Sequence, residues 1–266
     1  MPVSSAPVLY HLFVPTVSDQ LETGYFPGGG AGENTPMFEL ERVQYAIPAP
    51  LISLAVSSDM VAMGLSTNVL ILIELARPDR VVKLQIPRKP SEMTIHKIFL
   101  DPSGRHLLVT SQQGENHYLY KGWKKPKPLR SFKMVIESVA WNTQALLSST
   151  TSTSTKEILL GGRNGTIYEA SLDAEGDFFK SQERYLHSVF TLPERQPITG
   201  VEFVCFPPPE FKHGLVVVTT ASRIYQFVGN LDRRSDDAGK VFNTLFAKYH
   251  DTVPSMLFDW KSPDAL

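Results

Sequence analysis

Histidine side chains can bind metals or transfer protons, and three of the seven histidines in this 266-residue sequence lie close together in the chain. His96, His106 and His117 are separated by 10 and 11 residues. A zinc site adds cysteines or carboxylates at short, fixed spacings, and none accompanies these histidines. The spacing therefore favours structural histidines on separate strands, and we expect no metal ion and no metal-dependent chemistry.

A basic loop follows the last of these histidines. It gathers five cations around one tryptophan, namely Lys121, Trp123, Lys124, Lys125, Lys127 and Arg130. Such a loop can contact an acidic protein surface or a phospholipid headgroup, with the ring at the interface. A solvated connecting loop explains the same charges, since most charge runs on proteins face water. These six residues are the candidate partner or lipid contact, with the solvated loop as its alternative.

Other familiar motifs of binding and catalysis are missing. Gly28–Gly32 is rich in glycine like a phosphate-binding loop, but no strand precedes it and no Lys-Ser/Thr pair follows, so it is interpreted as a linker. The sequence has no Gly-x-Ser-x-Gly elbow, no His-Glu-x-x-His helix and no paired-carboxylate signature. We therefore expect no catalytic residue and no cofactor.

The histidines and the basic loop must be positioned by short strands. Ile95–Lys121 is predicted to form three of them, with type I turn chemistry at Asp101–Gly104 and a second turn at Gln113-Gly114. The pattern apolar-x-x-apolar-x-apolar that begins there recurs along the chain, with starts 44, 41 and 62 residues apart. The first two intervals match the roughly 40–45 residues of a four-stranded propeller blade. Loop insertions at Ser148–Thr155 and Asp173–Asp177 account for the longer third interval.

The sequence therefore predicts an all-β fold, a β-propeller of about four blades, preceded by a flexible arm. The arm is residues 1–46, with a strand at Phe38–Val43 that either leads into the first blade or completes the last blade of a closed ring. The propeller is residues 47–266, with blades at 47–90, 91–134, 135–193 and 194–260.

Two local signals add detail to this plan. Asn164-Gly165 predicts a type I′ hairpin, because both residue types tolerate positive φ. Val241–Tyr249 has the apolar spacing of a helix, and Met256–Trp260 that of one more strand.

Bulk properties narrow the class of partner. The net charge of −1 gives no overall attraction to nucleic acid, so we expect none to bind. A single cysteine, Cys205, fits a reducing compartment such as the cytoplasm. No apolar run approaches the ~18 residues of a membrane span. We expect contact with membranes only through partners or the protein surface.

Several runs of this sequence resemble one known family. The motifs are His96–Asp101 with Ser103–Leu108, Ile136–Asn142, Ile224–Gly229 and Leu245–Tyr249. The chain is similar, from about Leu51 to Tyr249, to the Pep-three/Deep orange family. These proteins are vacuolar protein sorting subunits of the class C core shared by the HOPS and CORVET tethering complexes.

This resemblance implies an amino-terminal propeller of roughly seven blades, followed in the family by an α-helical solenoid and a RING zinc finger. This chain has neither, so we expect a fragment or truncated isoform with an incomplete ring. The implied function is a non-catalytic tethering scaffold in endosome-to-vacuole or lysosome trafficking and vesicle fusion. Its implied partners are other class C subunits and, through the complex, Rab GTPases and SNAREs. The implied location is cytoplasmic, peripheral on late endosomes and on the vacuole or lysosome.

Two other functions remain as alternatives. A propeller enzyme, for example a hydrolase, places carboxylates or histidines at the mouth of the central channel. The first-strand acids here, Glu137 and Glu202, do not recur in every blade, which disfavours an enzyme. The other alternative is a WD-type module that reads peptides.

Overall fold

The computed structural model describes residues 9–13, 39–43, 46–148, 152–175, 178–206, 212–232, 240–251 and 255–257. The chain divides into two units, residues 1–50 and residues 51–266. In the first unit, β1 (Leu9–Phe13) and β2 (Glu39–Val43) form an antiparallel pair. The strand predicted at Phe38–Val43 therefore exists, but its partner is β1 and not a strand of the last blade. Gly28–Gly32 and most of the predicted flexible arm lie outside the described residues.

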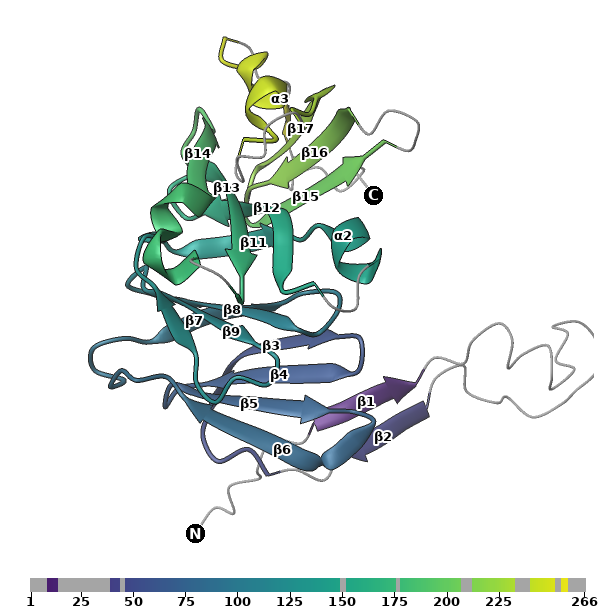
Figure 1. Cartoon of the computed structure of the whole chain (residues 1–266), viewed down its shortest axis with the longest axis vertical. Coiled ribbons are helices and arrows are strands. Elements are labelled where there is room, and N and C mark those ends of the chain that lie inside the picture. Colours follow the sequence, from purple (N-terminus) through teal and green to yellow (C-terminus); the bar gives the residue numbers. More distant parts are fainter. Residues whose placement is uncertain are drawn as a thin grey trace, which may run out of the picture. The chain divides into compact units, whose positions relative to one another are not determined.

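The second unit consists of four antiparallel sheets of four strands, each formed by consecutive strands of the chain (Figure 1). Blade one contains β3 (Leu51–Ser57), β4 (Met60–Leu65), β5 (Val69–Glu74) and β6 (Arg77–Gln85). Blade two contains β7 (Ile95–Leu100), β8 (His106–Ser111), β9 (Asn116–Tyr120) and β10 (Lys127–Leu129). Blade three contains β11 (Ile136–Ala140), β12 (Ser154–Gly162), β13 (Thr166–Asp173) and β14 (Leu186–Thr191). Blade four contains β15 (Gly200–Cys205), β16 (His213–Thr219), β17 (Arg223–Asn230) and β18 (Ser255–Leu257).

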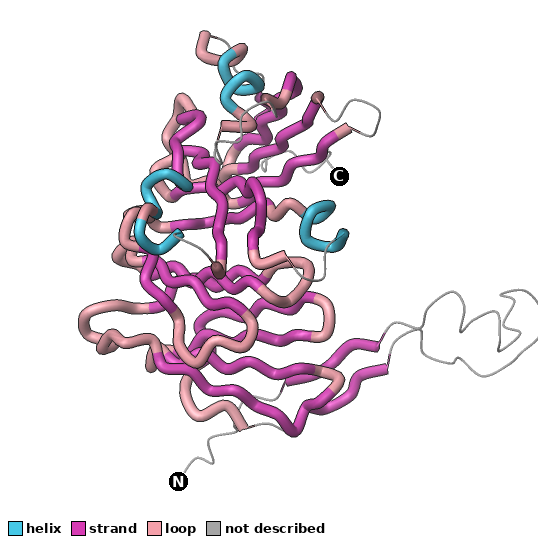
Figure 2. Tube along the Cα trace, in the orientation of Figure 1, coloured by secondary structure: helices cyan, strands magenta, loops and turns pink. Residues whose placement is uncertain are grey.

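The first strands of successive blades lie beside one another, β3 next to β7, β7 next to β11, and β11 next to β15. Within the described residues, strand is the predominant structure and helix is confined to short segments (Figure 2). These are α2 (Thr143–Ser148), α3 (Asn243–Ala247) and two 3₁₀ turns, Phe178–Lys180 and Gln182–Tyr185. The all-β, partial propeller is confirmed, and each sheet lies within one of the four predicted blade ranges.

Short turns that contain glycine join the first three strands of blade two. Gly104 and Gly114 have φ values of +68° and +78°, in the left-handed region that glycine enters at little cost. Gly165 occupies the equivalent turn of blade three, but Asn164 does not have positive φ. The predicted hairpin is confirmed by the pairing of β12 with β13, but its type I′ turn is wrong. The Gly165 N–H donates to the Gly162 carbonyl at 3.2 Å, and of the two turn residues only Gly165 is left-handed. Blade one places Asn68, with φ of +59°, at the position of Gly114 and Gly165.

Three elements differ from the sequence prediction. Strand β10 begins at Lys127 and ends at Leu129, whereas the sequence predicts a loop at Lys127. The Phe132 carbonyl accepts a 2.5 Å hydrogen bond from the Asn116 amide, which fixes the turn toward blade three. Helix α2 was not foreseen; the Asn142 side chain caps it by accepting a 2.9 Å bond from the Ala145 N–H. The expected Ser148–Thr155 loop is shorter, because β12 begins at Ser154.

Each interface between blades is closed by apolar packing and by one recurring hydroxyl contact. Ser53 Oγ accepts the Ile98 N–H at 3.1 Å, and Thr110 Oγ1 accepts the Ile136 N–H at 3.1 Å. Ser138 Oγ donates to the Ile198 carbonyl at 2.8 Å. A first or second strand of one blade thus satisfies a backbone group of the next, which keeps the blades in register.

One face of blade one is left exposed along β3. Along β3, exposed side chains alternate with half-buried ones, and Ile52, Leu54 and Val56 are 43%, 45% and 59% exposed. In a closed propeller such a row would pack against another sheet. The apolar row is therefore what an interrupted ring leaves at its first blade.

Candidate functional site

The three histidines singled out by the sequence lie on three neighbouring strands, in different settings. His106 is fully buried, and its Nδ1 is 2.7 Å from the Tyr118 hydroxyl. Burial lowers the pKa of His106 to about 4, and burial also lowers the pKa of His117. Both rings are therefore neutral at physiological pH and belong to the core of blade two. Among the described residues, no group of three or more metal-ligating side chains converges.

His96 instead joins an ionic cluster that links blades two and three. The cluster is His96, Lys97, Glu137 and Arg163. Glu137, on β11, accepts from Lys97 Nζ at 2.8 Å and from Arg163 Nε at 2.7 Å, and its Oε2 is 2.9 Å from His96 Nε2. Burial alone raises the pKa of Glu137, but the hydrogen bonds from Lys97, His96 and Arg163 outweigh it and lower the pKa to about 2.

This cluster holds a carboxylate that stays ionised at neutral pH. A general base works best with a pKa near the working pH, and a carboxylate engaged by three partners is far from that. The cluster therefore acts as an ion pair between β7 and β11, the first strands of blades two and three, and holds these two blades together.

The basic loop divides into a packed part and an exposed part. Trp123 is half-buried, and its ring centroid lies 5.4 Å from that of Tyr118 and 5.7 Å from that of Phe179. Lys127 Nζ sits 3.9 Å from the centre of the Trp123 ring, a cation–π contact. The tryptophan and Lys127 therefore belong to an aromatic cluster between blades two and three.

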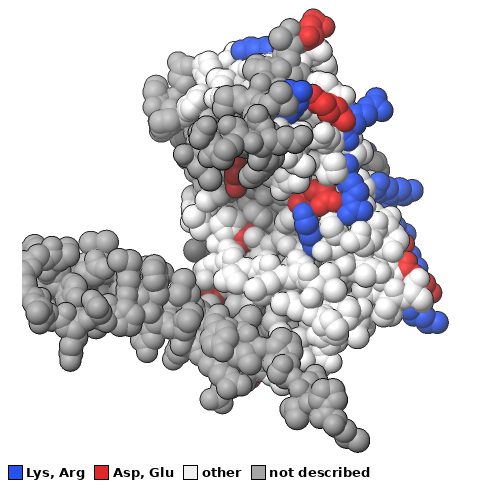
Figure 3. All heavy atoms as spheres, turned by 180° about the vertical axis from the view of Figure 1, so that it is seen from behind, with Lys and Arg blue, Asp and Glu red and all other residues white. Residues whose placement is uncertain are grey.

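The other cations of the loop face water. Lys121, Lys124, Lys125 and Arg130 are exposed. Lys121 reaches back to blade one, with Nζ 3.2 Å from Glu74 Oε1. Figure 3 shows one face of the molecule, on which many of the coloured charged side chains lie along one edge.

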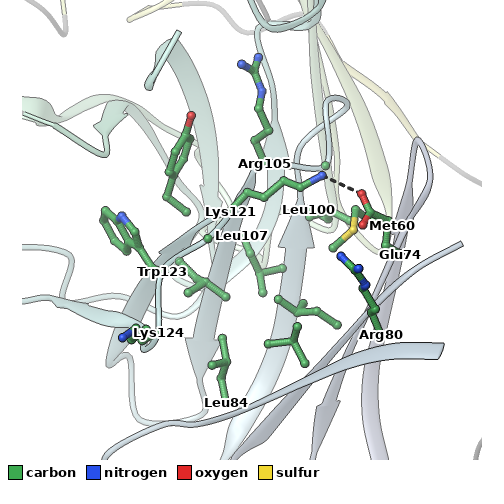
Figure 4. A pocket seen from close by; sticks show the side chains of 16 residues that line it. Met60, Glu74, Arg80, Leu84, Leu100, Arg105, Leu107, Lys121, Trp123 and Lys124 are labelled. Carbon is green, nitrogen blue, oxygen red and sulfur yellow. Dashed lines mark hydrogen bonds and ion pairs between the residues drawn. The ribbon is translucent and has the colours of Figure 1, made fainter. Parts of the chain in front are cut away.

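Three members of this loop, Lys121, Trp123 and Lys124, border a pocket of about 530 Å³ between blades one and two (Figure 4). Its walls are two apolar rows that follow from strand register. On blade two, Leu100 pairs with Leu107, and Leu107 pairs with Leu119. On blade one, Leu72 of β5 pairs with Val82 of β6. Deeper members of both rows are buried, but Val82 is 46% exposed, so the apolar surface continues to the mouth.

The rim of this interblade pocket is mainly cationic. Arg80, Lys121 and Lys124 line it together with one acid, Glu74. In Figure 4, Lys121 extends toward Glu74 across the mouth, with Arg80 on the blade-one side and Lys124 beside Trp123. Arg105 also lines the pocket, but its guanidinium donates to the Leu146 and Ser152 carbonyls at 3.0 and 3.3 Å, toward blade three.

Sequence reasoning found one half of this site and missed the other. The basic loop was recognised from its charge, whereas Arg80, Val82 and Leu84 received no role beyond their place in the predicted first blade, residues 47–90. Residues two apart on a strand share a face, so these three side chains face the same way on β6. That period-two spacing was the available signal.

Comparison with known proteins identifies the fold. The model of the Pep3/Vps18/deep orange beta-propeller domain matches residues 36–259, which include all four blades. This chain belongs to the Pep3/Vps18/deep orange family.

Three curated relatives agree with this assignment. The chain is 32% identical over 231 residues to the vacuolar protein sorting-associated protein 18 homolog of Danio rerio, covering 84% of this chain and 22% of that protein. It is 29% identical to vacuolar sorting protein 18 of Arabidopsis thaliana, covering 71% of this chain and 19% of the relative. It is 24% identical to the vacuolar membrane protein pep3 of Schizosaccharomyces pombe, covering 83% and 23%.

The chain thus spans about a fifth of the length of these relatives. The described part of the chain contains no helix long and apolar enough to cross a membrane.

Proposed function

We propose that this chain is a non-catalytic propeller scaffold of a HOPS- or CORVET-type tethering complex, acting in endosome-to-vacuole or lysosome trafficking. The observation that carries the proposal is the family match over residues 36–259, which covers every blade. The names of the relatives, which are vacuolar sorting proteins, support the pathway. The proposed location is the cytoplasmic side of late endosomes and of the vacuole or lysosome, as a peripheral protein.

The polar groups of the propeller support a structural role. Glu137, the first-strand acid with the most partners, is held as an ion pair with a pKa of about 2. It therefore lacks the near-neutral pKa of a catalytic acid or base. The proposed partners are other class C subunits and, through them, Rab GTPases and SNAREs, bound by blade surfaces.

Co-purification tests this proposal. Residues 1–266 are tagged and expressed in cells of the source organism. The amount of class C sorting subunits that co-purifies with them should be well above the amount that co-purifies with a tagged, unrelated propeller. Charge reversal at Lys124 and Lys125 tests whether the exposed end of the basic loop contributes, since its contacts should weaken above ~0.15 M salt, where screening acts over ~8 Å. Recovery of chromatin proteins in place of sorting subunits would favour a peptide-reading module and contradict the proposal.

A further inference from the structure

We propose that the interblade pocket between blades one and two binds a short acidic peptide through a large apolar side chain. The inference goes beyond the tethering proposal, because it concerns a separate site and its test needs no other subunit. It depends on three observations: an apolar interior, a cationic rim and a size suited to side chains.

The interior selects apolar groups. Leu107 and Leu119 line its floor and are each 2% exposed, and Leu72, Val82 and Leu100 carry the same surface toward the mouth. A volume of about 530 Å³ is within the range of pockets that bind small ligands and is large enough for one or two side chains. A phosphate group would find no ring of polar donors inside, so the occupant that enters must be apolar.

The rim selects negative charge beside that apolar group. Arg80 and Lys124 make no ion pair with any described residue, and Lys121 has only the single pair with Glu74. Three cations against one acid leave the mouth positive, and complementary charge accelerates association and orients the ligand. Asp and Glu flanking a buried anchor would meet these cations while remaining in water.

An extended peptide fits this arrangement better than a lipid. Side chains two apart on a strand project to the same side, so a peptide can place two apolar groups in the pocket and its acids on the rim. A phospholipid would place its charged headgroup against the rim but would have to withdraw an acyl chain from the bilayer to fill the interior. The proposed ligand is therefore a peptide with alternating acidic and apolar residues.

A labelled peptide tests the proposal directly. The probe is fluorescein-tagged Asp-Asp-Phe-Glu-Leu-Asp-Asp, titrated with residues 1–266 and followed by fluorescence anisotropy. Two control probes replace Phe and Leu by Ser, or replace every acid by Lys. We expect the first probe alone to bind, and its affinity to fall severalfold as salt rises from about 0.05 to about 0.3 M.

The chain offers matched variants. Lys124 lines the pocket, whereas its neighbour Lys125 is equally exposed and does not; Arg80 and Arg77 form a similar pair on β6. Lys124→Glu and Arg80→Glu should each weaken binding about fivefold or more, and Lys125→Glu and Arg77→Glu by less than about twofold. Val82→Glu should abolish binding by placing a carboxylate in the apolar mouth, and Val82→Ser should weaken it, with circular dichroism confirming that each variant is folded.

Three results would overturn the proposal. The first is no binding of the acidic probe at millimolar concentration. The second is an equal loss for Lys124→Glu and Lys125→Glu, which would show diffuse attraction to the basic loop. The third is binding of phosphatidylcholine vesicles containing phosphatidylinositol phosphate that Val82→Glu weakens while the peptide does not bind, which would make a lipid the occupant.

Discussion

The interface between blades two and three and the interface between blades one and two are built differently. The first is filled: the ionic cluster joins the first strands, and the rings of Tyr118, Trp123 and Phe179 pack against one another. The second has packed leucines at its base but opens into the interblade pocket, with a single rim ion pair between Lys121 and Glu74. The comparison indicates that a propeller can hold two blades together through one filled interface, while another interface stays open and can take the peptide proposed above.

The interface between blades three and four resembles the filled one. Glu169, on β13, is fully buried and accepts the Val241 and Phe242 N–H groups at 2.8 and 3.0 Å, just before α3. The Tyr225 hydroxyl donates to Glu194, which also pairs with Arg223 Nε at 2.9 Å. Glu137, Glu169 and Glu194 at these two interfaces all have partners, whereas Arg80 and Lys124 at the pocket make no ion pair with any described residue.

The largest expected effect comes from the ionic cluster. Glu137→Gln removes the charge that Lys97 and Arg163 share, and leaves these two cations facing one another beside His96. Breaking a largely buried ion pair on one side typically costs about 3 kcal/mol or more, and the Glu137 side chain is 10% exposed. Urea unfolding of wild type and variant measures the loss.

Glu202→Gln is the matched control, because Glu202 is an exposed first-strand acid of blade four. It should change the free energy of unfolding by less than about 0.5 kcal/mol. The pH dependence has a defined sign: a pKa lowered from 4.5 to about 2 stabilises the fold above pH 4.5. The difference between wild type and Glu137→Gln should therefore be constant at neutral pH and shrink as pH falls from 4.5 toward 2. Equal stabilities of the two proteins at pH 7 would show that the cluster is only a surface contact.

The next largest effect concerns Glu169, and here the dependence of stability on pH has the opposite sign. Burial raises the pKa of Glu169 from 4.5 to about 7, and the negative charge of Glu157 acts in the same direction, while the two backbone N–H groups oppose it. An acid whose pKa is raised by folding binds its proton more tightly in the folded state, so stability falls as pH rises between those values.

Glu169→Gln isolates this contribution, because the variant has no proton to lose. Relative to the variant, wild type should lose about 3 kcal/mol of unfolding free energy between pH 4.5 and pH 7 and lose no more above that. Thermal or urea unfolding across this range, with both proteins in the same buffers, measures the difference. A difference that does not vary with pH would mean that Glu169 ionises as it does in water.

A smaller effect is expected at the tryptophan. Lys127→Met removes the cation that lies 3.9 Å from the centre of the Trp123 ring. The loss should be about 0.5–1 kcal/mol, with Lys127→Arg close to wild type because arginine also stacks on aromatic faces. Lys125→Met, in the exposed part of the same loop, is the control and should have no measurable effect. If both methionine variants behave alike in urea, the ring contact does not contribute to stability.

The sequence predicted the repeat because blades reuse a local pattern. First strands such as Ile95–Leu100 and Ile136–Ala140 begin with the same apolar-x-x-apolar spacing, and turn residues such as Gly104 mark the hairpins. What it missed depends on contacts between blades. Nothing adjacent to Glu137 in sequence reveals that His96 and Arg163 converge on it. Likewise, nothing adjacent to Val82 reveals that it lines a pocket together with residues of blade two.

The same reason explains the partial success at the basic loop. Its charge was visible as a local run, but the division between a packed Trp123 with Lys127 and an exposed Lys124 with Lys125 depends on Phe179, some fifty residues away in the chain. Composition predicts that a surface is basic. It does not predict which of its cations already have an aromatic partner.

Amide hydrogen exchange of residues 1–266, resolved blade by blade, tests most directly the central claim that this is an open array of four blades with unequal interfaces. Blades two and three have neighbours on both faces, so we expect their inner strands to exchange slowest. Blades one and four should exchange faster, with β6 of blade one, next to the pocket, among the fastest strands. Uniform protection across all four blades would show that the chain closes on itself and would contradict the account.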